Sequence, residues 1–257
     1  MWSEDVWDPA QYERFRDERS QPFFDLVGLV RPRPGMRVVD LGCGTGELTA
    51  LLHGRLEARE TIGIDASEAM LEQARPRSAG GLRFEPGDIA AWDGRDFDLV
   101  FSNAALHWVE DHDELFTRLR RALTAGGQLA VQVPANHEHP SQTVAVAVAR
   151  EEPFRRAFRG WTRVSPVLAP HEYAGLLERI GFAEQHVRLQ VYGHRLDSRD
   201  EVVEWLRGTT LTDYQQRLDP DLWDGFLARY RERLLPRLPD RRPFFFTFQR
   251  ILIWGRL

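Results

Sequence analysis

The sequence predicts an α/β fold with a doubly wound, mostly parallel sheet and a helical cap formed by the C-terminal half. Two observations predict it. From about residue 35 to 135, short runs rich in Val, Ile and Leu alternate with helix-like stretches, the pattern of a parallel sheet covered on both faces. After residue 134 the alternation loosens and helical stretches dominate. We therefore expect three parts: a helical segment 1–34 that covers the site, a core 35–135, and residues 136–257, which supply cap helices and the last two strands of the same sheet.

Seven segments are expected to form strands, because each is rich in β-branched or aromatic residues and is bounded by turn residues. In chain order they are 37–41, 60–65, 82–85, 97–103, 128–134, 183–196 and 243–255. The sheet is therefore expected to be Rossmann-like and seven-stranded. The two late strands extend one edge of it.

Apolar periodicity and capping residues predict the helices. The first covers 8–30, and Gly126–Gly127 are expected to end a helix over 113–124. The other helical stretches are expected at 47–55, 67–76, 140–160, 171–181, 199–208 and 219–235.

Composition excludes several classes of function. The chain has 257 residues, a formal net charge of −5 and one cysteine, Cys43, so an internal disulfide and a cysteine-built zinc site are excluded. All 34 basic residues are arginine, which excludes a Schiff-base lysine and a Walker lysine. The negative charge gives no general attraction to nucleic acid. With no long apolar run and no signal-like N-terminus, we expect a cytoplasmic protein without a membrane or nucleic-acid partner, either a monomer or a weak homodimer.

The stretch VVDLGCGTGELTALL (38–52) carries a glycine loop between a predicted strand and a predicted helix. A dinucleotide fingerprint would place its third glycine at position 47, where Glu47 stands, and a carboxylate there would oppose a pyrophosphate. What remains is an acid before the loop, Asp40, and a second acid, Asp65, at the end of the next strand. Glycines allow close backbone approach, and the two acids suit a cation and ribose hydroxyls. The loop thus favours a ligand with a cation, a ribose and no phosphate.

These residues resemble the class I S-adenosylmethionine-dependent methyltransferases. The resemblance rests on VVDLGCGTGELT, GIDASEAML (63–71), GDIAAW (87–92) and LTAGGQLAVQVP (123–134), in that order. It implies that the loop glycines contact the methionine part of the cofactor and that Asp65 binds its ribose. It also implies that Asp88 and the Ile89 amide meet the adenine. The implied cofactor-binding residues are Asp40, Gly42, Cys43, Gly44, Thr45, Gly46, Asp65, Ala66, Met70, Asp88, Ile89 and Asn103. Met70 is equally compatible with a place in the helix core.

Outside these motifs the chain resembles the trans-aconitate methyltransferases. The matching stretches are WDPAQYERFRDERSQPFFDLV (7–27), FSNAALHWVEDHDELF (101–116), LAVQVPANHEHPS (129–141) and FFFTFQRILIWG (244–255). The resemblance implies that a small polycarboxylic acid such as trans-aconitate is converted to a monomethyl ester. An ionised carboxylate needs no catalytic base, so the expected roles are in positioning the substrate. The residues expected to do this are Arg19, His107, Trp108, Asn136 and His137, with Arg250 as a weaker carboxylate clamp.

Alternatives remain for these residues and for the function. Arg19 is equally compatible with a helix surface, His107 with packing at a helix start, and Arg250 with an acid at the sheet edge. An O- or C-methyltransferase with an apolar or natural-product acceptor is an alternative, because four aromatic residues expected in the cap would allow it: Trp161, Tyr173, Trp205 and Trp223. A regulator that binds the cofactor without turnover is disfavoured by the unbroken first motif. The histidines at 107, 112, 137 and 139 match no firm ligand spacing, so no metal is expected.

Overall fold

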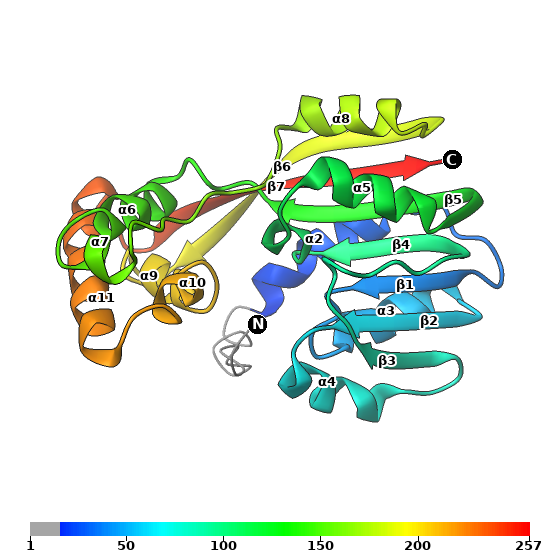
Figure 1. The fold of residues 1–257 in the computed structure, drawn as a ribbon, viewed down its shortest axis with the longest axis horizontal. Helices are drawn as coiled ribbons and strands as arrows, with labels where there is room; N and C mark the ends of the chain where they lie inside the picture. Colours follow the sequence, from blue (N-terminus) through cyan, green and yellow to red (C-terminus); the bar gives the residue numbers. More distant parts are fainter. Residues whose placement is uncertain (1–15) are drawn as a thin grey trace. The chain divides into compact units, whose positions relative to one another are not determined.

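The computed structural model describes residues 16–257, with side chains from residue 21 onward. Seven strands form one sheet in the order β3-β2-β1-β4-β5-β7-β6 (Figure 1). Strands β1 to β5 pair in parallel, and β7 pairs antiparallel with β5. The strands are β1 Arg37–Leu41, β2 Glu60–Asp65, β3 Leu82–Pro86, β4 Phe97–Asn103, β5 Leu123–Pro134, β6 Glu184–Leu196 and β7 Phe244–Arg256. The predicted seven-stranded, mostly parallel sheet is confirmed.

The helices follow the expected alternation, and short polar side chains cap several of them. Ser67 accepts a hydrogen bond from the Met70 amide at the start of α4, and Asp219 accepts one from the Leu222 amide at the start of α11, which satisfies otherwise unpaired amides. The helices are α2 Arg16–Val27, α3 Glu47–Leu56, α4 Glu68–Ala74, α5 His112–Arg121, α6 Pro140–Ala149, α7 Phe154–Ala157, α8 Pro170–Arg179, α9 Glu201–Arg207, α10 Thr212–Gln215 and α11 Pro220–Leu234, with 3₁₀ turns η1 Arg75–Arg77, η2 Leu106–Trp108 and η3 Leu235–Arg237.

The chain divides into two compact units. The sheet unit contains Asp17–Ala135, Pro166–Gln190 and Gln249–Leu257, whereas the described part of the helical unit contains Arg16, Asn136–Ser165 and Val191–Phe248. Helix α8, which the sequence placed among the cap helices, belongs to the sheet unit. Strands β6 and β7 each contribute residues to both units. The covering role of segment 1–34 stays a prediction, since most of that segment lies outside the described residues.

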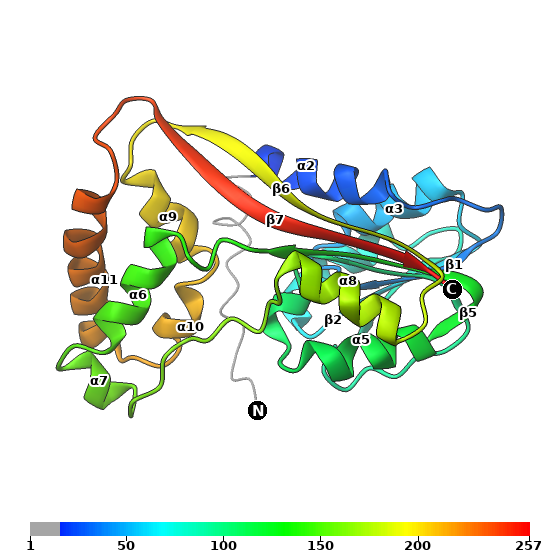
Figure 2. The same ribbon diagram turned by 90° about the horizontal axis from the view of Figure 1, so that it is seen from above.

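Helices cover both faces of the sheet unit (Figure 2). On one face, α2 and α3 pack Phe23 and Leu52 against Phe101 and Trp254, all of them buried. On the other face, α5 and α8 meet with Tyr173 fully buried. Each such side chain contributes ~1.5–3 kcal/mol on burial. The two apolar faces therefore hold the sheet rigid and leave its strand ends to carry polar groups.

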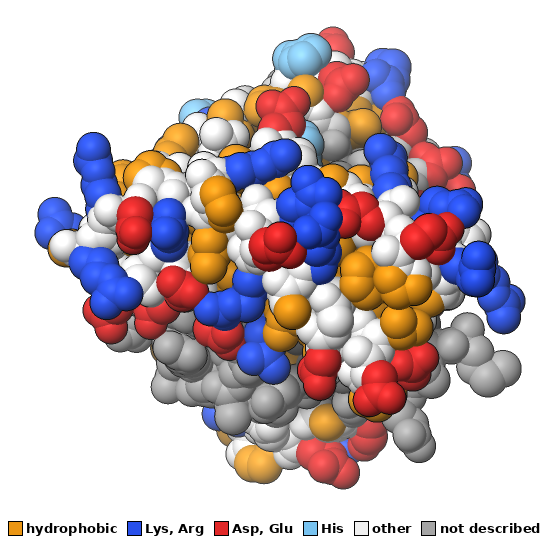
Figure 3. All heavy atoms as spheres, turned by 90° about the vertical axis from the view of Figure 1, so that its left-hand side faces the viewer, with side chains coloured by type: hydrophobic (Ala, Val, Ile, Leu, Met, Phe, Trp, Pro, Cys, Tyr) orange, Lys and Arg blue, Asp and Glu red, His pale blue; other side chains and the backbone are white. Residues whose placement is uncertain are grey.

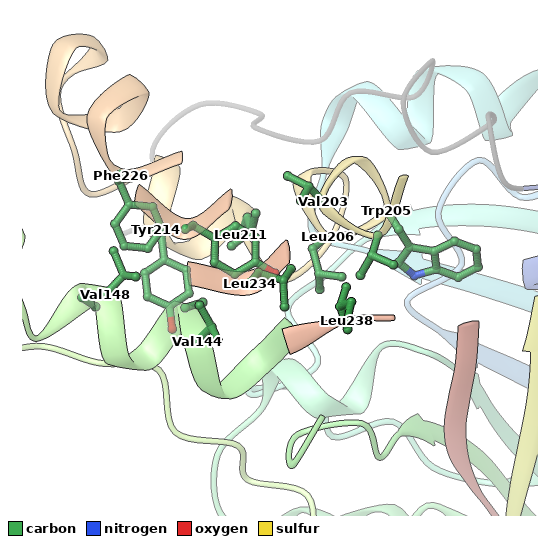
Figure 4. Packing of buried hydrophobic residues seen from close by; sticks show 14 of the residues in the cluster. Val144, Val148, Val203, Trp205, Leu206, Leu211, Tyr214, Phe226, Leu234 and Leu238 are labelled. Carbon is green, nitrogen blue, oxygen red and sulfur yellow. The ribbon is translucent and has the colours of Figure 1, made fainter. Parts of the chain in front are cut away.

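The helical unit has its own core (Figure 4). Tyr214 of α10 and Phe226 of α11 stack with ring centroids 5.1 Å apart, and α6 adds Val144 and Val148 to the same cluster. On the surface drawn in Figure 3, arginine and acidic side chains are interspersed. In the same unit, Arg229 of α11 pairs with Glu151, which follows the end of α6, at 2.7 Å.

Two predicted elements were wrong in detail. The single helix expected over 140–160 is two helices, α6 and α7, because Pro153 disfavours helical geometry in the residue before it and has no amide proton. Gly126–Gly127 do not end a helix but lie inside β5, which begins at Leu123. The β4–β5 register shifts between Phe97 and Leu99, and this irregularity accommodates the glycines.

Within residues 16–257, no helix is long and apolar enough to cross a membrane.

Candidate cofactor and acceptor site

The glycine loop links β1 to α3 and is fastened to the end of β2. The amides of Gly42 and Cys43 donate to the Ile64 carbonyl at 2.8 and 3.0 Å, and the Gly46 amide donates to the Cys43 carbonyl at 3.1 Å. All three loop glycines have positive φ, which favours glycine. The loop backbone is therefore held by hydrogen bonds within the described protein.

The three glycines differ in what faces them. A Cβ at Gly42 would lie 2.1 Å from the Cβ of Ala105, and one at Gly46 would lie 2.6 Å from the Phe84 ring. A Cβ at Gly44 would meet no heavy atom within 4 Å. Protein packing therefore explains Gly42 and Gly46, and Gly44 is the glycine whose Cα faces open space where a ligand fits.

Asp65 is oriented by two amides at the end of β2. Its Oδ2 accepts from the Gly44 amide at 2.8 Å and its Oδ1 from the Ser67 amide at 2.9 Å. A carboxylate offers about four lone-pair positions, and such an acceptor suits the two hydroxyls of a ribose. The Gly87 amide also donates to the Asp65 carbonyl at 2.9 Å, which connects this acid to the turn after β3.

Asp40 is a buried carboxyl at the end of β1, with 4% of its surface exposed. Burial raises its pKa to about 7; the hydrogen bond from Thr49 (2.6 Å) opposes the rise and the nearby Asp65 carboxylate adds to it. Burial, Asp40 and Asp65 also raise the pKa of the Cys43 thiol. The thiol therefore stays protonated and is a poor nucleophile, whereas Asp40 ionises near neutral pH and a bound cation would stabilise its charged form.

The adenine side of the predicted site is formed by the turn after β3 and the start of α4. Asp88 is exposed, and its Oδ1 accepts from the Ala90 amide at 2.9 Å. The Ile89 carbonyl accepts from Arg118 of α5 at 3.2 Å. Ala66 is exposed, whereas Met70 is 6% exposed. The turn is thus held from α5, with its amides at the same edge as Asp65.

The loop after β4 forms the acceptor side of the predicted site. Ala104 has φ 58°, a strained value for alanine, and its amide donates to the Gln132 carbonyl at 2.9 Å. The Oδ1 of Asn103 is buried without a hydrogen-bond partner among the described residues. In η2, the rings of His107 and Trp108 lie 4.6 Å apart. A buried acceptor next to a strained residue marks this loop as a ligand-binding edge.

His112 holds η2 in place through hydrogen bonds of its imidazole ring. Its Nε2 lies 3.1 Å from the Leu106 carbonyl and its Nδ1 lies 2.5 Å from the Tyr173 hydroxyl. The Tyr173 oxygen accepts from the Leu168 amide, so its proton is directed to Nδ1 and Nε2–H donates to Leu106. Burial lowers the His112 pKa. This histidine is therefore a neutral structural link.

The structure brings together the loop, Asp40, Asp65, the 88–89 turn and the 103–108 segment in the sheet unit. Half-buried Thr45 lies in the loop. Asn136, which is buried, and His137, which is exposed, belong to the helical unit. The side chain of Arg19 lies outside the described residues. Among residues 16–257, no group of three or more His, Cys, Asp or Glu is arranged to hold a metal ion.

Sequence reasoning missed four supporting residues. They are Thr49, Arg118, Gln132 and Ala105. Each acts through a contact that its motif or segment does not specify, such as the Ala105 methyl against Gly42. The available signal was position for Thr49, in the first turn of α3, and for Ala105 and Gln132, near strand ends, whereas Arg118 in α5 had none.

The residues present fit S-adenosylmethionine. Gly44 leaves room beside the loop, Asp65 offers acceptors suited to ribose hydroxyls, and Asp40 is a buried carboxyl whose charged form a cation would stabilise. Asn103 adds a buried acceptor for an ammonium group. The set lies past the carboxyl ends of β1, β2 and β4, which is where open α/β sheets bind ligands.

Comparisons with known proteins agree with this site. Residues 38–127 match the model of a methyltransferase domain. The chain is 44% identical to a trans-aconitate 2-methyltransferase of Deinococcus radiodurans over 96% of both chains. It is 40% identical to one of Variovorax paradoxus over 91% of both. The crystal structure of an S-adenosylmethionine-dependent methyltransferase from Mesorhizobium loti shares the fold, with a TM-score of 0.52 and 24% identity over 91% of this chain and 96% of that one.

The loop geometry, the sheet and near-full-length identity to two curated relatives together identify the family. The chain belongs to the trans-aconitate 2-methyltransferase family and is an S-adenosylmethionine-dependent methyltransferase.

Proposed function

We propose that this enzyme methylates a carboxylate of a small polycarboxylic acid such as trans-aconitate and releases the monomethyl ester. The observation that carries the proposal is the 44% identity to the trans-aconitate 2-methyltransferase of Deinococcus radiodurans, over 96% of this chain. The chemistry of a carboxylate acceptor also supports it. Such an acceptor is already ionised at neutral pH, so its methylation needs no proton acceptor from the protein.

S-adenosylmethionine supplies the methyl group: a carboxylate oxygen forms the new C–O bond while the S–CH₃ bond breaks and its electron pair remains on sulfur, giving S-adenosylhomocysteine. The protein contributes position and desolvation. Asp65, Asp40 and the loop would hold the donor, and the Asn103 loop would border the reacting groups. Acceptor positioning is proposed for Arg19, His107, Trp108, Asn136 and His137.

The alternative of an apolar acceptor loses its support. Trp205, Trp223 and Tyr173 are between 0 and 6% exposed and lie in the cores of their own units. Trp161 is half-buried and packs against Tyr214. These four aromatic residues are therefore accounted for by packing.

Incubation with methyl-labelled S-adenosylmethionine and trans-aconitate is expected to give a base-labile, labelled monomethyl ester, identified by mass spectrometry. The trimethyl ester of the same acid is the matched control, because it has no free carboxylate and is expected to remain unlabelled. A panel of other di- and tricarboxylic acids identifies the preferred acceptor. If no acid is labelled while S-adenosylhomocysteine still binds, the proposal is wrong.

Asp40 gives the cofactor-free enzyme a defined pH dependence. Its folded pKa of about 7 lies above the ordinary value of 3.8, so the unfolded chain releases this proton first and the free energy of unfolding falls as the pH rises from 4 to 7. The loss is on the order of 4 kcal/mol and levels off above pH 7. Urea unfolding of the native enzyme and of Asp40→Asn across this range is expected to show this component only in the native enzyme.

The same carboxyl reports on the cofactor. If the cofactor's ammonium group meets Asp40, binding lowers the Asp40 pKa, so S-adenosylhomocysteine binding near pH 6.5 is expected to release a proton. Calorimetric titration in two buffers of different ionisation enthalpy measures the release. An equal release by Asp40→Asn would assign the proton to another group.

A further inference from the structure

A buried polar pair connects the neighbouring strands β5 and β7 in the sheet unit. Arg250 of β7 is 6% exposed and Gln132 of β5 is fully buried. The Nη1 of Arg250 donates to the Gln132 Oε1 at 3.2 Å. An amide oxygen that holds one guanidinium nitrogen fixes the orientation of the whole planar fork.

The neighbouring polar atoms complete the arrangement. Gln132 pairs with Asn103 across β4 and β5, so their side chains lie on the same face of the sheet. The Gln132 Nε2 and the Asn103 Oδ1 are both buried without a hydrogen-bond partner among the described residues. Buried polar atoms of this kind are costly in a folded protein. A donor, an acceptor and an oriented guanidinium therefore lie together at one strand edge.

The strand order indicates which ligand this group meets. The cofactor's ribose acid, Asp65, ends β2 and the glycine loop leaves β1, whereas Arg250 lies on β7, on the far side of β4 and β5. At a strand spacing of ~4.8 Å, β7 is about 10 Å from β4 and about 14 Å from β1. Along the sheet from β2 to β7, the ends of the strands thus border first the ribose of the cofactor, then its methionine part, and finally the acceptor.

We propose that Arg250, oriented by Gln132, binds a carboxylate of the acceptor beside Asn103 and selects for polycarboxylic acids. This inference rests on the proposed function. An arginine fork can bind a carboxylate through two parallel hydrogen bonds, and the free Gln132 Nε2–H adds a third donor. Gln132 is the positioning residue of the pair, and the bound carboxylate is one that is not methylated.

The test compares Arg250→Met with Arg250→Lys and with Gln132→Glu. The matched control is Arg256→Met, on the same strand, whose guanidinium is half exposed and pairs with Glu184 at 3.5 Å. For each variant the acceptor KM, kcat and the Kd of S-adenosylhomocysteine are measured. Binding of labelled trans-aconitate to the enzyme saturated with S-adenosylhomocysteine is measured by equilibrium dialysis.

For Arg250→Met, the acceptor KM and Kd are expected to rise by about tenfold or more, with the Kd of S-adenosylhomocysteine unchanged. Arg250→Lys should recover part of the affinity because it keeps the charge. In Gln132→Glu the new carboxylate forms an ion pair with the Arg250 guanidinium and competes with the acceptor, so the acceptor KM should rise more than kcat falls. Arg256→Met is expected to match the native enzyme.

Three outcomes would overturn the inference. An unchanged acceptor KM and Kd in Arg250→Met excludes the contact. A weakened S-adenosylhomocysteine Kd with an unchanged acceptor Kd assigns the guanidinium to the cofactor's own carboxylate. If Arg250→Met does not fold, unchanged acceptor affinity in both Arg250→Lys and Gln132→Glu is decisive instead. Failure of the proposed function differs from all three, because the native enzyme itself would then methylate no acid.

Discussion

Asp65→Ala is expected to raise the Kd for S-adenosylhomocysteine by roughly 100-fold or more, because the two charge-assisted hydrogen bonds proposed between Asp65 and the ribose hydroxyls would be lost. The same change removes the acceptor that holds the Gly44 and Ser67 amides, so the loop also loses its orientation. Asp65→Asn retains one oxygen and should have an intermediate effect. Calorimetric titration of each variant measures the change.

The control for this prediction is Asp224→Ala, which removes an exposed carboxylate of α11. Its Kd for S-adenosylhomocysteine is expected to equal that of the native enzyme. Native-like cofactor affinity in Asp65→Ala would show that the ribose binds elsewhere, since the loss of loop orientation and of the ribose contact act in the same direction.

Gly42→Ala and Gly44→Ala are expected to separate packing from ligand binding in one loop. At Gly42 a methyl group would overlap Ala105 and adopt a φ of 80°, so the free energy of unfolding should fall by about 3–5 kcal/mol. At Gly44 the space is open, and only the cost of a left-handed alanine, about 1 kcal/mol, is expected. Urea unfolding of both variants measures the difference.

The expected effect of Gly44→Ala is on cofactor binding and not on stability. Its methyl group lies in the open space beside the loop, so S-adenosylhomocysteine binding should weaken while the protein stays folded. Gly42→Ser is a useful second variant, because any Cβ at this position meets Ala105. Equal stability of the Gly42 and Gly44 variants would contradict the close packing between the loop and Ala105.

The strands that border the site could be predicted from the sequence because their signals are local, whereas the order in which they pair is known from the structure. Strand β2, for example, is a short apolar run that ends at an acid, and its expected bounds, 60–65, equal those observed. The glycine loop is equally local. Glu47, Asp65 and the absence of lysine predicted a phosphate-free ligand with a ribose, and the resemblance to methyltransferases implied S-adenosylmethionine.

Other features depend on contacts that sequence patterns do not contain. The glycines at 126–127 resemble a helix end, and only the pairing of β5 with β4 places them in a strand. The Arg250–Gln132 contact joins residues 118 apart, and no local periodicity predicts it. Burial of Asp40 likewise depends on α3 packing over β1, and its raised pKa follows from that burial.

The contact between Gly42 and Ala105 also constrains how this enzyme can evolve. The Ala105 methyl lies directly against the Gly42 backbone, so a larger residue at 105 is expected to press on the loop proposed to bind the methyl donor. A lineage that changes its acceptor is therefore expected to keep position 105 small and to accumulate substitutions elsewhere, at positions such as 103, 132 and 250. Directed evolution toward new acids should accordingly recover variants at those three positions and none with a bulkier residue at 105.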